Sequence, residues 1–204
     1  DKGLVLPPNL APFQVIIVPI FKTDIEFEQV SALANKIIKD LKKCNVSVKF
    51  DNRTTYRPGA KFAQHELQGV PLRIAIGPKD LENNTVELSR RDDFSKNIIP
   101  IESINEKIPK ILEDIQHSLY VKANDFRIEH TTEVDSFEEF KDVLNNKGGF
   151  ISAHWDGSSE SENKIKEITK ATIRCIPLNI DKSEGKCVYS GKKSDQRVLF
   201  AKAY

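Results

Sequence analysis

The sequence contains no methionine, and several other informative residue types are scarce. It has only three cysteines, Cys44, Cys175 and Cys187, an odd number that does not form a disulfide framework. This excludes a disulfide-stabilised secreted domain and favours a reducing compartment, the cytoplasm. A chain without an initiator residue also indicates a fragment of a longer polypeptide, or a product processed at its start.

Long apolar runs and an excess of one charge are also absent. No run approaches the ~20 residues that a membrane-spanning helix needs, and no signal peptide is present, so we expect a soluble protein with no membrane partner. Lysine and arginine number 31 against 30 acidic residues, a net charge of +1 that does not by itself indicate nucleic-acid binding. A chain of 204 residues with 39% apolar residues can form one large or two small cores.

Catalytic constellations are missing as well. None of the four histidines, His65, His117, His130 and His154, stands near a serine or cysteine in a nucleophile-elbow setting. The glycines form no phosphate-binding loop. We therefore expect the chain to be catalytically inactive alone. A small doubly wound metabolic enzyme stays open as an alternative, because βαβ order does not exclude it.

Hydrophobic periodicity predicts an α/β domain over residues 1–130, including an N-terminal linker. Apolar or alternating runs indicate strands, and a helix capped by Thr23 or Asp24 separates the first two. A second helix over residues 59–68 and a third from about residue 102 to 124, with Pro109 inside it, complete the pattern. The prediction is a five-stranded mixed sheet flanked by three helices, with strands at residues 13–20, 46–50, 71–77, 85–90 and 98–101.

The composition becomes more acidic after Glu129, and we place the domain boundary near Thr131. Residues 131–204 are predicted to form a small α+β domain. Asp135 and Glu138 resemble a capping box at the start of a helix. A second helix over 159–169 and strands at 150–154, 172–177 and 198–203 follow.

The stretch from Arg57 to Asp80 is the most informative part of the chain. Pro58 and Gly69 can begin and end its helix, on which Phe62 and Glu66 share one face. The following strand places Arg73 near its middle. A buried guanidinium is very costly unless it finds a carboxylate or a ligand.

Side chains in this stretch suit recognition of unstacked guanines in RNA. An aromatic ring stacks on a base, arginine makes a two-pronged contact with guanine O6 and N7, and a carboxylate accepts from guanine N1–H and the amino group. The alternative is structural. In it Phe62 is a core residue, Glu66 and Arg73 form a salt bridge between helix and strand, and the side chains of Lys79 and Asp80 lie on a turn without a binding role. The candidate RNA-binding residues are Phe62, Glu66, Arg73, Lys79 and Asp80.

Local charge favours a phosphate-bearing partner. Seven basic residues between Arg53 and Arg91 face four acidic ones. An excess of positive charge attracts a phosphate backbone, although such runs are also common on solvated faces.

Three segments together resemble the region after the catalytic core of prolyl-tRNA synthetases, of the type shared by archaea, eukaryotes and part of the bacteria. They are LVLPPNLAPFQVIIVPI, PGAKFAQHELQGVPLRIAIGPKDLE and GKCVYSGKKSDQRVLFAKAY, in that order. The resemblance covers essentially the whole chain and implies an anticodon-binding domain followed by a C-terminal domain. It implies stacking and guanine-reading roles for the five residues above. The anticodon for proline ends in GG, because every proline codon begins with CC.

The resemblance also implies partners. These are tRNA(Pro) rather than DNA, the catalytic domain of the same chain, and a second copy in a homodimeric parent. The fragment itself requires no cofactor, whereas the full-length enzyme uses ATP and Mg. The alternative is a stand-alone anticodon-domain-like adaptor that binds RNA.

Many relatives carry four cysteines that bind structural zinc in the C-terminal domain. The matching positions here hold Asp156, Ser161, Cys187 and Ser190. One thiolate and one carboxylate do not close a tetrahedral zinc site, so we predict no bound zinc. The expected replacement is apolar packing around Trp155, Ile165, Ile168, Ile173, Ile176 and Leu199. His154 and Cys175 are expected to be a polar strand residue and a small buried hydrophobe rather than substitute ligands.

Tyr204 ends the chain. In the resembling family the terminal tyrosine lies near the catalytic domain, which implies an assisting role in aminoacylation. Anchoring of a sheet edge is the alternative, and deletion of the last two residues from the full enzyme distinguishes the two by the rate of prolyl transfer.

Overall fold

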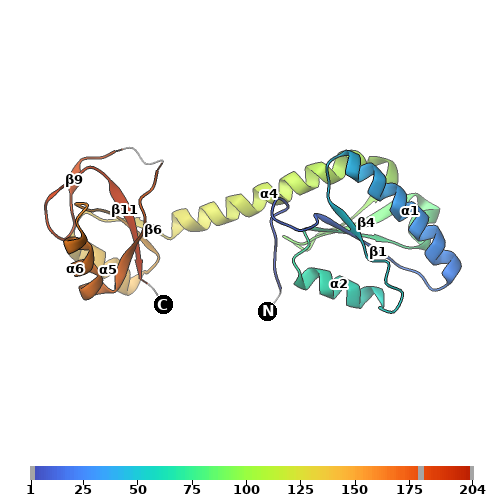
Figure 1. The fold of residues 1–204 in the computed structure, drawn as a ribbon, viewed down its shortest axis with the longest axis horizontal. Helices are drawn as coiled ribbons and strands as arrows, with labels where there is room; N and C mark the ends of the chain where they lie inside the picture. The colour runs from blue at the N-terminus through green and yellow to red at the C-terminus, as the bar shows by residue number, and fades with distance from the viewer. Residues whose placement is uncertain (1–2, 179–181, 203–204) are drawn as a thin grey trace. The chain divides into compact units, whose positions relative to one another are not determined.

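The computed structural model describes residues 3–178 and 182–202 of the chain. Contacts divide it into two compact units, Asp1–Val121 and Lys122–Tyr204. The division falls within a long helix, α4 (Ile104–Glu129) (Figure 1). No helix in the described part of the chain is long and apolar enough to cross a membrane.

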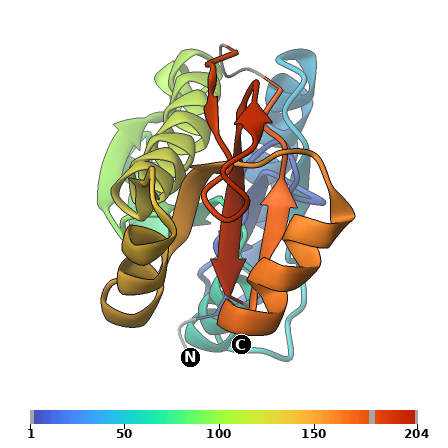
Figure 2. The same cartoon turned by 90° about the vertical axis from the view of Figure 1, so that its left-hand side faces the viewer.

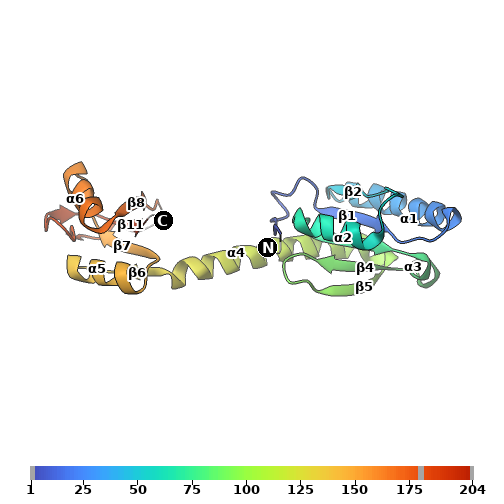
Figure 3. The same ribbon diagram turned by 90° about the horizontal axis from the view of Figure 1, so that it is seen from below.

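The first unit contains the predicted five-stranded mixed sheet, in the order β2-β1-β3-β4-β5. β1 pairs in parallel with both β2 and β3, whereas β4 runs antiparallel to β3 and β5. β4 and β5 form a hairpin at one edge of the sheet (Figure 3). The strands are β1 (Val15–Pro19), β2 (Val48–Phe50), β3 (Leu72–Ile76), β4 (Thr85–Arg90) and β5 (Lys96–Pro100).

Helices α1 (Asp24–Lys43) and α2 (Pro58–Leu67) lie on opposite sides of this sheet (Figure 1). Apolar side chains of α1 and α4 pack on one face, around Val15, Ile17 and Ile74. On the other face a smaller cluster around Ile16 and Val18 packs against α2. Since neighbouring strand residues point to opposite faces, Arg73, paired in register with Ile16, faces α2.

Local sequence signals explain most helix boundaries. Thr23, one of the two predicted caps, caps α1, and it does so through a reciprocal pair with Glu26. α4 continues through Pro109, which cannot donate to the Asn105 carbonyl as a helical residue would. The Cys44 thiol contacts that carbonyl instead, with Sγ 3.7 Å from the oxygen.

Two short elements of the first unit were not predicted. A helix, α3 (Pro78–Asn83), follows β3 where the structural alternative placed a turn, and a single 3-10 turn, Ile101–Ser103, precedes α4. In α3, Asp80 Oδ2 accepts a hydrogen bond from Gly77 N at 2.8 Å. That carboxylate therefore satisfies one of the unpaired N–H groups at the helix start.

The second unit is the predicted small α+β domain (Figure 2). Its four-stranded sheet has the order β6-β7-β11-β8, with a separate β9–β10 pair. Helices α5 (Phe137–Asn146) and α6 (Ser159–Thr169) contribute Phe140 and Ile165 to one core cluster. The strands are β6 (Thr131–Glu133), β7 (Phe150–His154), β8 (Ala171–Cys175), β9 (Gly185–Lys186), β10 (Lys193–Ser194) and β11 (Arg197–Lys202).

Three details of the prediction for this unit were wrong. The capping box of α5 is formed by Ser136 and Glu139, not by Asp135 and Glu138, because the helix begins one residue later. Ile168 and Ile176 are 53% and 46% exposed and so lie outside the core.

Candidate nucleic-acid interface

Helix α2 places the candidate residues against the sheet. Pro58 stands at its first position, and Gly69 follows its end with φ +74, a conformation that favours glycine. A Cβ on Gly69 would also lie 2.8 Å from the backbone of Leu4. The chain can therefore turn sharply from α2 toward β3, which brings the helix face next to the strand.

Phe62, Glu66 and Arg73 are brought together at this join. The Arg73 guanidinium lies over the Phe62 ring, with Cζ 3.7 Å from the ring centroid. Its Nη1 donates to Glu66 Oε1 at 2.7 Å, and Nη2 lies 4.0 Å from Glu87 Oε1. The salt bridge of the structural alternative is present. The ring, the acid and the guanidinium also form one contiguous group, as the RNA-binding interpretation requires.

The exposure of these side chains differs. The Arg73 side chain is only 6% exposed, whereas that of Glu66 is 46% exposed. Phe62 is half-buried and packs against the small cluster around Ile16. Arg73 Nε has no hydrogen-bond partner among the described residues. A buried N–H group without a partner is unusual, and it leaves hydrogen-bonding capacity for a ligand.

A small hollow adjoins these three side chains. Its volume is about 10 Å³, room for no more than one water molecule. Arg91 and Phe94 complete its wall, and Arg91 Nε donates to the Glu66 carbonyl at 2.9 Å. A base can therefore enter only if side chains in this group move.

Lys79 and Asp80 lie elsewhere, on α3 beyond the far end of β3. Lys79 is exposed, and the Asp80 carboxylate caps its own helix. No contact joins either residue to Phe62, Glu66 or Arg73 in the described part of the chain. The structure thus groups three of the five candidates and separates the other two.

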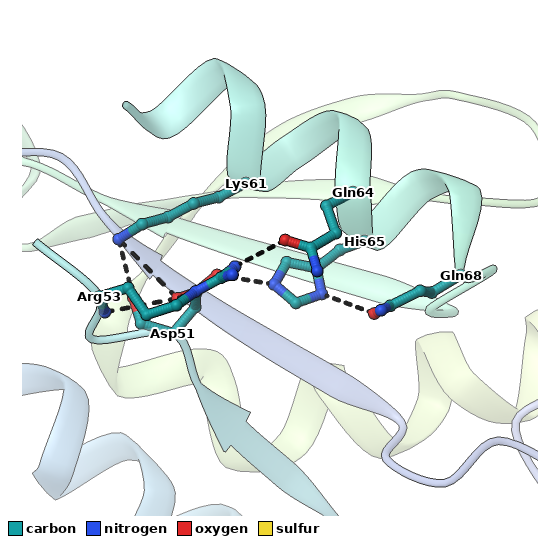
Figure 4. Close-up of polar contacts among 6 residues, drawn as sticks. All are labelled: Asp51, Arg53, Lys61, Gln64, His65 and Gln68. Atoms are coloured by element: carbon teal, nitrogen blue, oxygen red, sulfur yellow. Dashed lines mark hydrogen bonds and ion pairs between the residues drawn. The ribbon is translucent and has the colours of Figure 1, made fainter. Parts of the chain in front are cut away.

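A buried polar network that sequence reasoning missed holds α2 against the sheet edge (Figure 4). Asp51, just after β2, accepts from His65 Nε2 at 2.8 Å and from Arg53 Nε at 2.7 Å. Lys61 Nζ donates to the Asp51 carbonyl at 3.0 Å and lies 3.9 Å from Oδ1. All three of Asp51, Lys61 and His65 are nearly inaccessible to solvent. The sequence signal is a second polar stripe on α2 at i, i+4 and i+7, formed by Lys61, His65 and Gln68.

The ionised form of Asp51 is stabilised by its surroundings. Hydrogen bonds from Arg53 hold the pKa of its carboxyl well below the ordinary value, and His65 and Lys61 lower it further. Burial acts in the opposite direction but is outweighed. Lys61 is therefore paired inside the protein rather than available to a phosphate. Arg90 is similarly bound to Asp92 at 2.8 Å and Asp114 at 2.5 Å, so much of the local positive excess is neutralised internally.

In the second unit, the four positions compared above with zinc ligands on the basis of the resemblance form a hydrogen-bonded cluster. Asp156 Oδ1 accepts from Ser161 Oγ at 2.6 Å, and Oδ2 accepts from Ser190 Oγ at 2.5 Å. Ser190 N donates to Cys187 Sγ at 3.5 Å. The hydroxyls therefore point their protons at the carboxylate, and the donor set does not fit zinc. Cys175 is exposed rather than buried as expected, and His154 bonds Ser194 at 3.2 Å.

We expect purified protein to contain well under one zinc per chain by elemental mass spectrometry, because one thiolate cannot hold the ion against solvent. A chelator should leave the melting temperature unchanged. One equivalent of zinc per chain would contradict this prediction.

Asp156 should make the second unit sensitive to acid. Burial acts to raise the pKa of its carboxyl, but hydrogen bonds from Ser161, Ser190 and Ser158 outweigh it and keep the pKa below the ordinary value. A depressed pKa stabilises the fold above the unfolded-state value near ~4, and that stability is lost as pH falls toward the folded-state pKa. We expect Asp156→Ala to lower the free energy of unfolding at pH 7 by ~1–3 kcal/mol. Urea unfolding followed by fluorescence of Trp155, the single tryptophan, measures this change.

Below pH 4, the difference in unfolding free energy between Asp156→Ala and the parent chain should become smaller. Asp195→Ala, at an exposed carboxylate in the same unit, serves as a control and should change little. Equal stability of the Asp156 variant and the parent at pH 7 would contradict the role of this cluster.

A broader groove of about 530 Å³ lies elsewhere in the first unit. It is lined by the N-terminal segment, the end of α1 and α4, including Gln14, Cys44 and His117. Gln14 immediately precedes β1, so this groove adjoins the amino end of that strand. The metabolic-enzyme alternative requires a pocket at the carboxyl ends of the strands, and this groove does not meet that requirement. Tyr204 lies outside the described residues.

Comparisons with known proteins show which family the chain resembles. The anticodon binding domain family matches residues 14–111, and the prolyl-tRNA synthetase C-terminal family matches residues 137–204. A solved prolyl-tRNA synthetase from Cryptosporidium parvum, complexed with L-proline and AMP, has a TM-score of 0.86 at 40% identity. The similarity covers 100% of this chain and 43% of that one.

Curated relatives are similar over the whole chain. Proline–tRNA ligases of Flavobacterium psychrophilum and Christiangramia forsetii are 65% and 59% identical over 204 residues, and that of Porphyromonas gingivalis is 53% identical. The chain spans 42% of the first two relatives and 41% of the third. The first unit therefore contains the anticodon-binding domain of an aminoacyl-tRNA synthetase. The chain belongs to the prolyl-tRNA synthetase family and corresponds to its anticodon-binding and C-terminal domains.

Proposed function

We propose that this chain recognises the anticodon of tRNA(Pro) within a prolyl-tRNA synthetase, which in its full-length form joins L-proline to that tRNA with ATP and Mg. Arg73 makes the two-pronged contact with a guanine, Glu66 accepts from its N1–H and amino group, and Phe62 stacks on its face. The Asp80 carboxylate accepts from a neighbouring guanine, and Lys79 contacts a base or a phosphate.

The contiguity of Phe62, Glu66 and Arg73 carries this proposal. The Arg73 guanidinium supplies a fork of donors and lies within 4 Å of both the Phe62 ring, a stacking surface, and the Glu66 carboxylate. That combination matches the hydrogen-bonding edge of guanine. The unpartnered Arg73 Nε supports it, because a guanine acceptor would satisfy that group.

Binding must rearrange this group, since the neighbouring hollow holds at most one water. Glu66 is the group that can move, because its side chain is 46% exposed and its carboxylate bonds only Arg73 among the described residues. A guanine that replaces the Arg73–Glu66 contact would bond both partners at once. The pair therefore keeps the buried guanidinium neutralised until RNA arrives.

The remaining partners follow from the same proposal. The catalytic domain of the same polypeptide and a second copy of the enzyme are the expected protein partners, and the cytoplasm is the expected location. The stand-alone adaptor is less favoured, because the relatives described above are full-length proline–tRNA ligases.

Filter binding of this chain to tRNA transcripts tests the proposal. A transcript with the GG-ending anticodon should bind more tightly than transcripts in which either guanine is replaced by adenine. Each mismatched contact should weaken binding by ~1–3 kcal/mol. Equal affinity for all transcripts would refute anticodon recognition by this chain.

A further inference from the structure

Phe94 is an exposed aromatic side chain beside the candidate site. It lies in the turn between β4 and β5 and is 54% exposed. Its ring lines the same small hollow as Phe62, Glu66 and Arg73. A second ring therefore adjoins the group that we assign to guanine recognition.

The backbone at Phe94 does not suit an aromatic residue. Its φ is +61, in the left-handed region where bulky side chains are strained. Asn45 and Asn84 occupy similar conformations elsewhere, and asparagine tolerates them well. Neither burial nor backbone conformation explains a phenylalanine at this position. Strain at an exposed side chain indicates a function outside the folded core.

The turn holds the Phe94 ring in a defined place. Ser95 N donates to Asp93 Oδ1 at 2.8 Å, and Arg90 N donates to Ser95 O at 3.0 Å. The Arg91 guanidinium lies beside the ring, with Cζ 4.9 Å from its centroid. Arg91 also bonds the Glu66 carbonyl, as described above, so the turn is tied to the helix that carries the candidate site.

We propose that Phe94 is a second stacking platform, which receives the base adjacent to the guanine at Arg73. This inference rests on the proposed function. Aromatic stacking accepts any base, because every base has a π-face. Phe94 therefore adds affinity but no preference for sequence, whereas Arg73 provides both.

Binding of anticodon stem-loop RNA to the Phe94→Ala and Phe94→Gly variants tests this role. One stacked base corresponds to about a 5- to 150-fold change in affinity. Both variants should lose affinity in that range for the GG-ending stem-loop and for its adenine-substituted forms, with the ratio between them unchanged. Phe94→Gly should also melt at a higher temperature, because glycine removes the backbone strain. Tyr120→Ala removes an aromatic ring that is 66% exposed on α4, and its affinity should match the parent chain.

The outcomes separate the two hypotheses. If the parent chain prefers the GG-ending RNA and both Phe94 variants bind as tightly as it does, the platform is refuted while anticodon recognition stands. A changed ratio between RNAs, or a lower melting temperature in both variants, would also overturn the platform. If the parent chain shows no preference at all, the proposed function itself fails.

Discussion

Asp51→Ala is expected to lower the free energy of unfolding of the first unit by ~3–5 kcal/mol. The substitution leaves Lys61 buried without the carboxylate that neutralises it and removes the hydrogen-bond partner of the buried His65 ring. An uncompensated buried charge is among the largest single destabilising effects. Hydrogen exchange in residues 48–68, measured by mass spectrometry, should show faster opening of β2 and α2.

Asp40→Ala provides the matched control for Asp51→Ala. Asp40 pairs with Lys43 at 2.8 Å, but that pair is on the surface, where solvent screens it. Its loss should leave exchange in residues 48–68 unchanged. Similar effects of the two substitutions would show that the buried network does not hold α2.

Arg73→Ala is expected to weaken binding of tRNA(Pro) by ~1–3 kcal/mol and to reduce discrimination against adenine in the anticodon. Arg73→Lys should lose most of the same discrimination, because an ammonium group lacks the two-pronged geometry of guanidinium. Filter binding with the cognate and adenine-substituted transcripts measures both quantities.

A structural effect of Arg73→Ala must be separated from a binding effect. The guanidinium covers the Phe62 ring, so the melting temperature of each variant is measured alongside its affinity. Wild-type affinity and discrimination in a folded Arg73→Ala variant would contradict the assignment of Arg73.

Local patterns predicted the longer helices and strands of the fold. The apolar run before Pro19 and the alternating strand after Pro71 produce β1 and β3, and the Thr23 cap sets the start of α1. The Asp135 capping box was wrong by one residue because Ser136 offers an equivalent oxygen at the next position. Spacing alone did not distinguish the Asp135–Glu138 pair from the Ser136–Glu139 pair.

Long-range contacts of the site were less predictable. The pairing of Asp51 with Lys61 and His65 joins residues 10 and 14 positions apart across a turn. The polar stripe on α2 marks Lys61 and His65, but it does not indicate Asp51 as their partner. Lys79 and Asp80 are separated from Arg73 because Arg73 lies near the start of β3, whereas they lie on α3, after the strand ends. Ile168 and Ile176 were assigned to the core on hydrophobicity, although each lies near the end of an element.

The central claim is that the Arg73 guanidinium reads the Hoogsteen edge of one anticodon guanine. A double-mutant cycle tests it: the parent chain and Arg73→Ala are each titrated with a GG-ending stem-loop and with one carrying 7-deazaguanine, which lacks the N7 acceptor. We expect that removal of N7 lowers the affinity of the parent chain for the stem-loop but lowers that of Arg73→Ala little further. The effects of the two changes on binding free energy are then strongly non-additive. Fully additive losses at both guanines would contradict it.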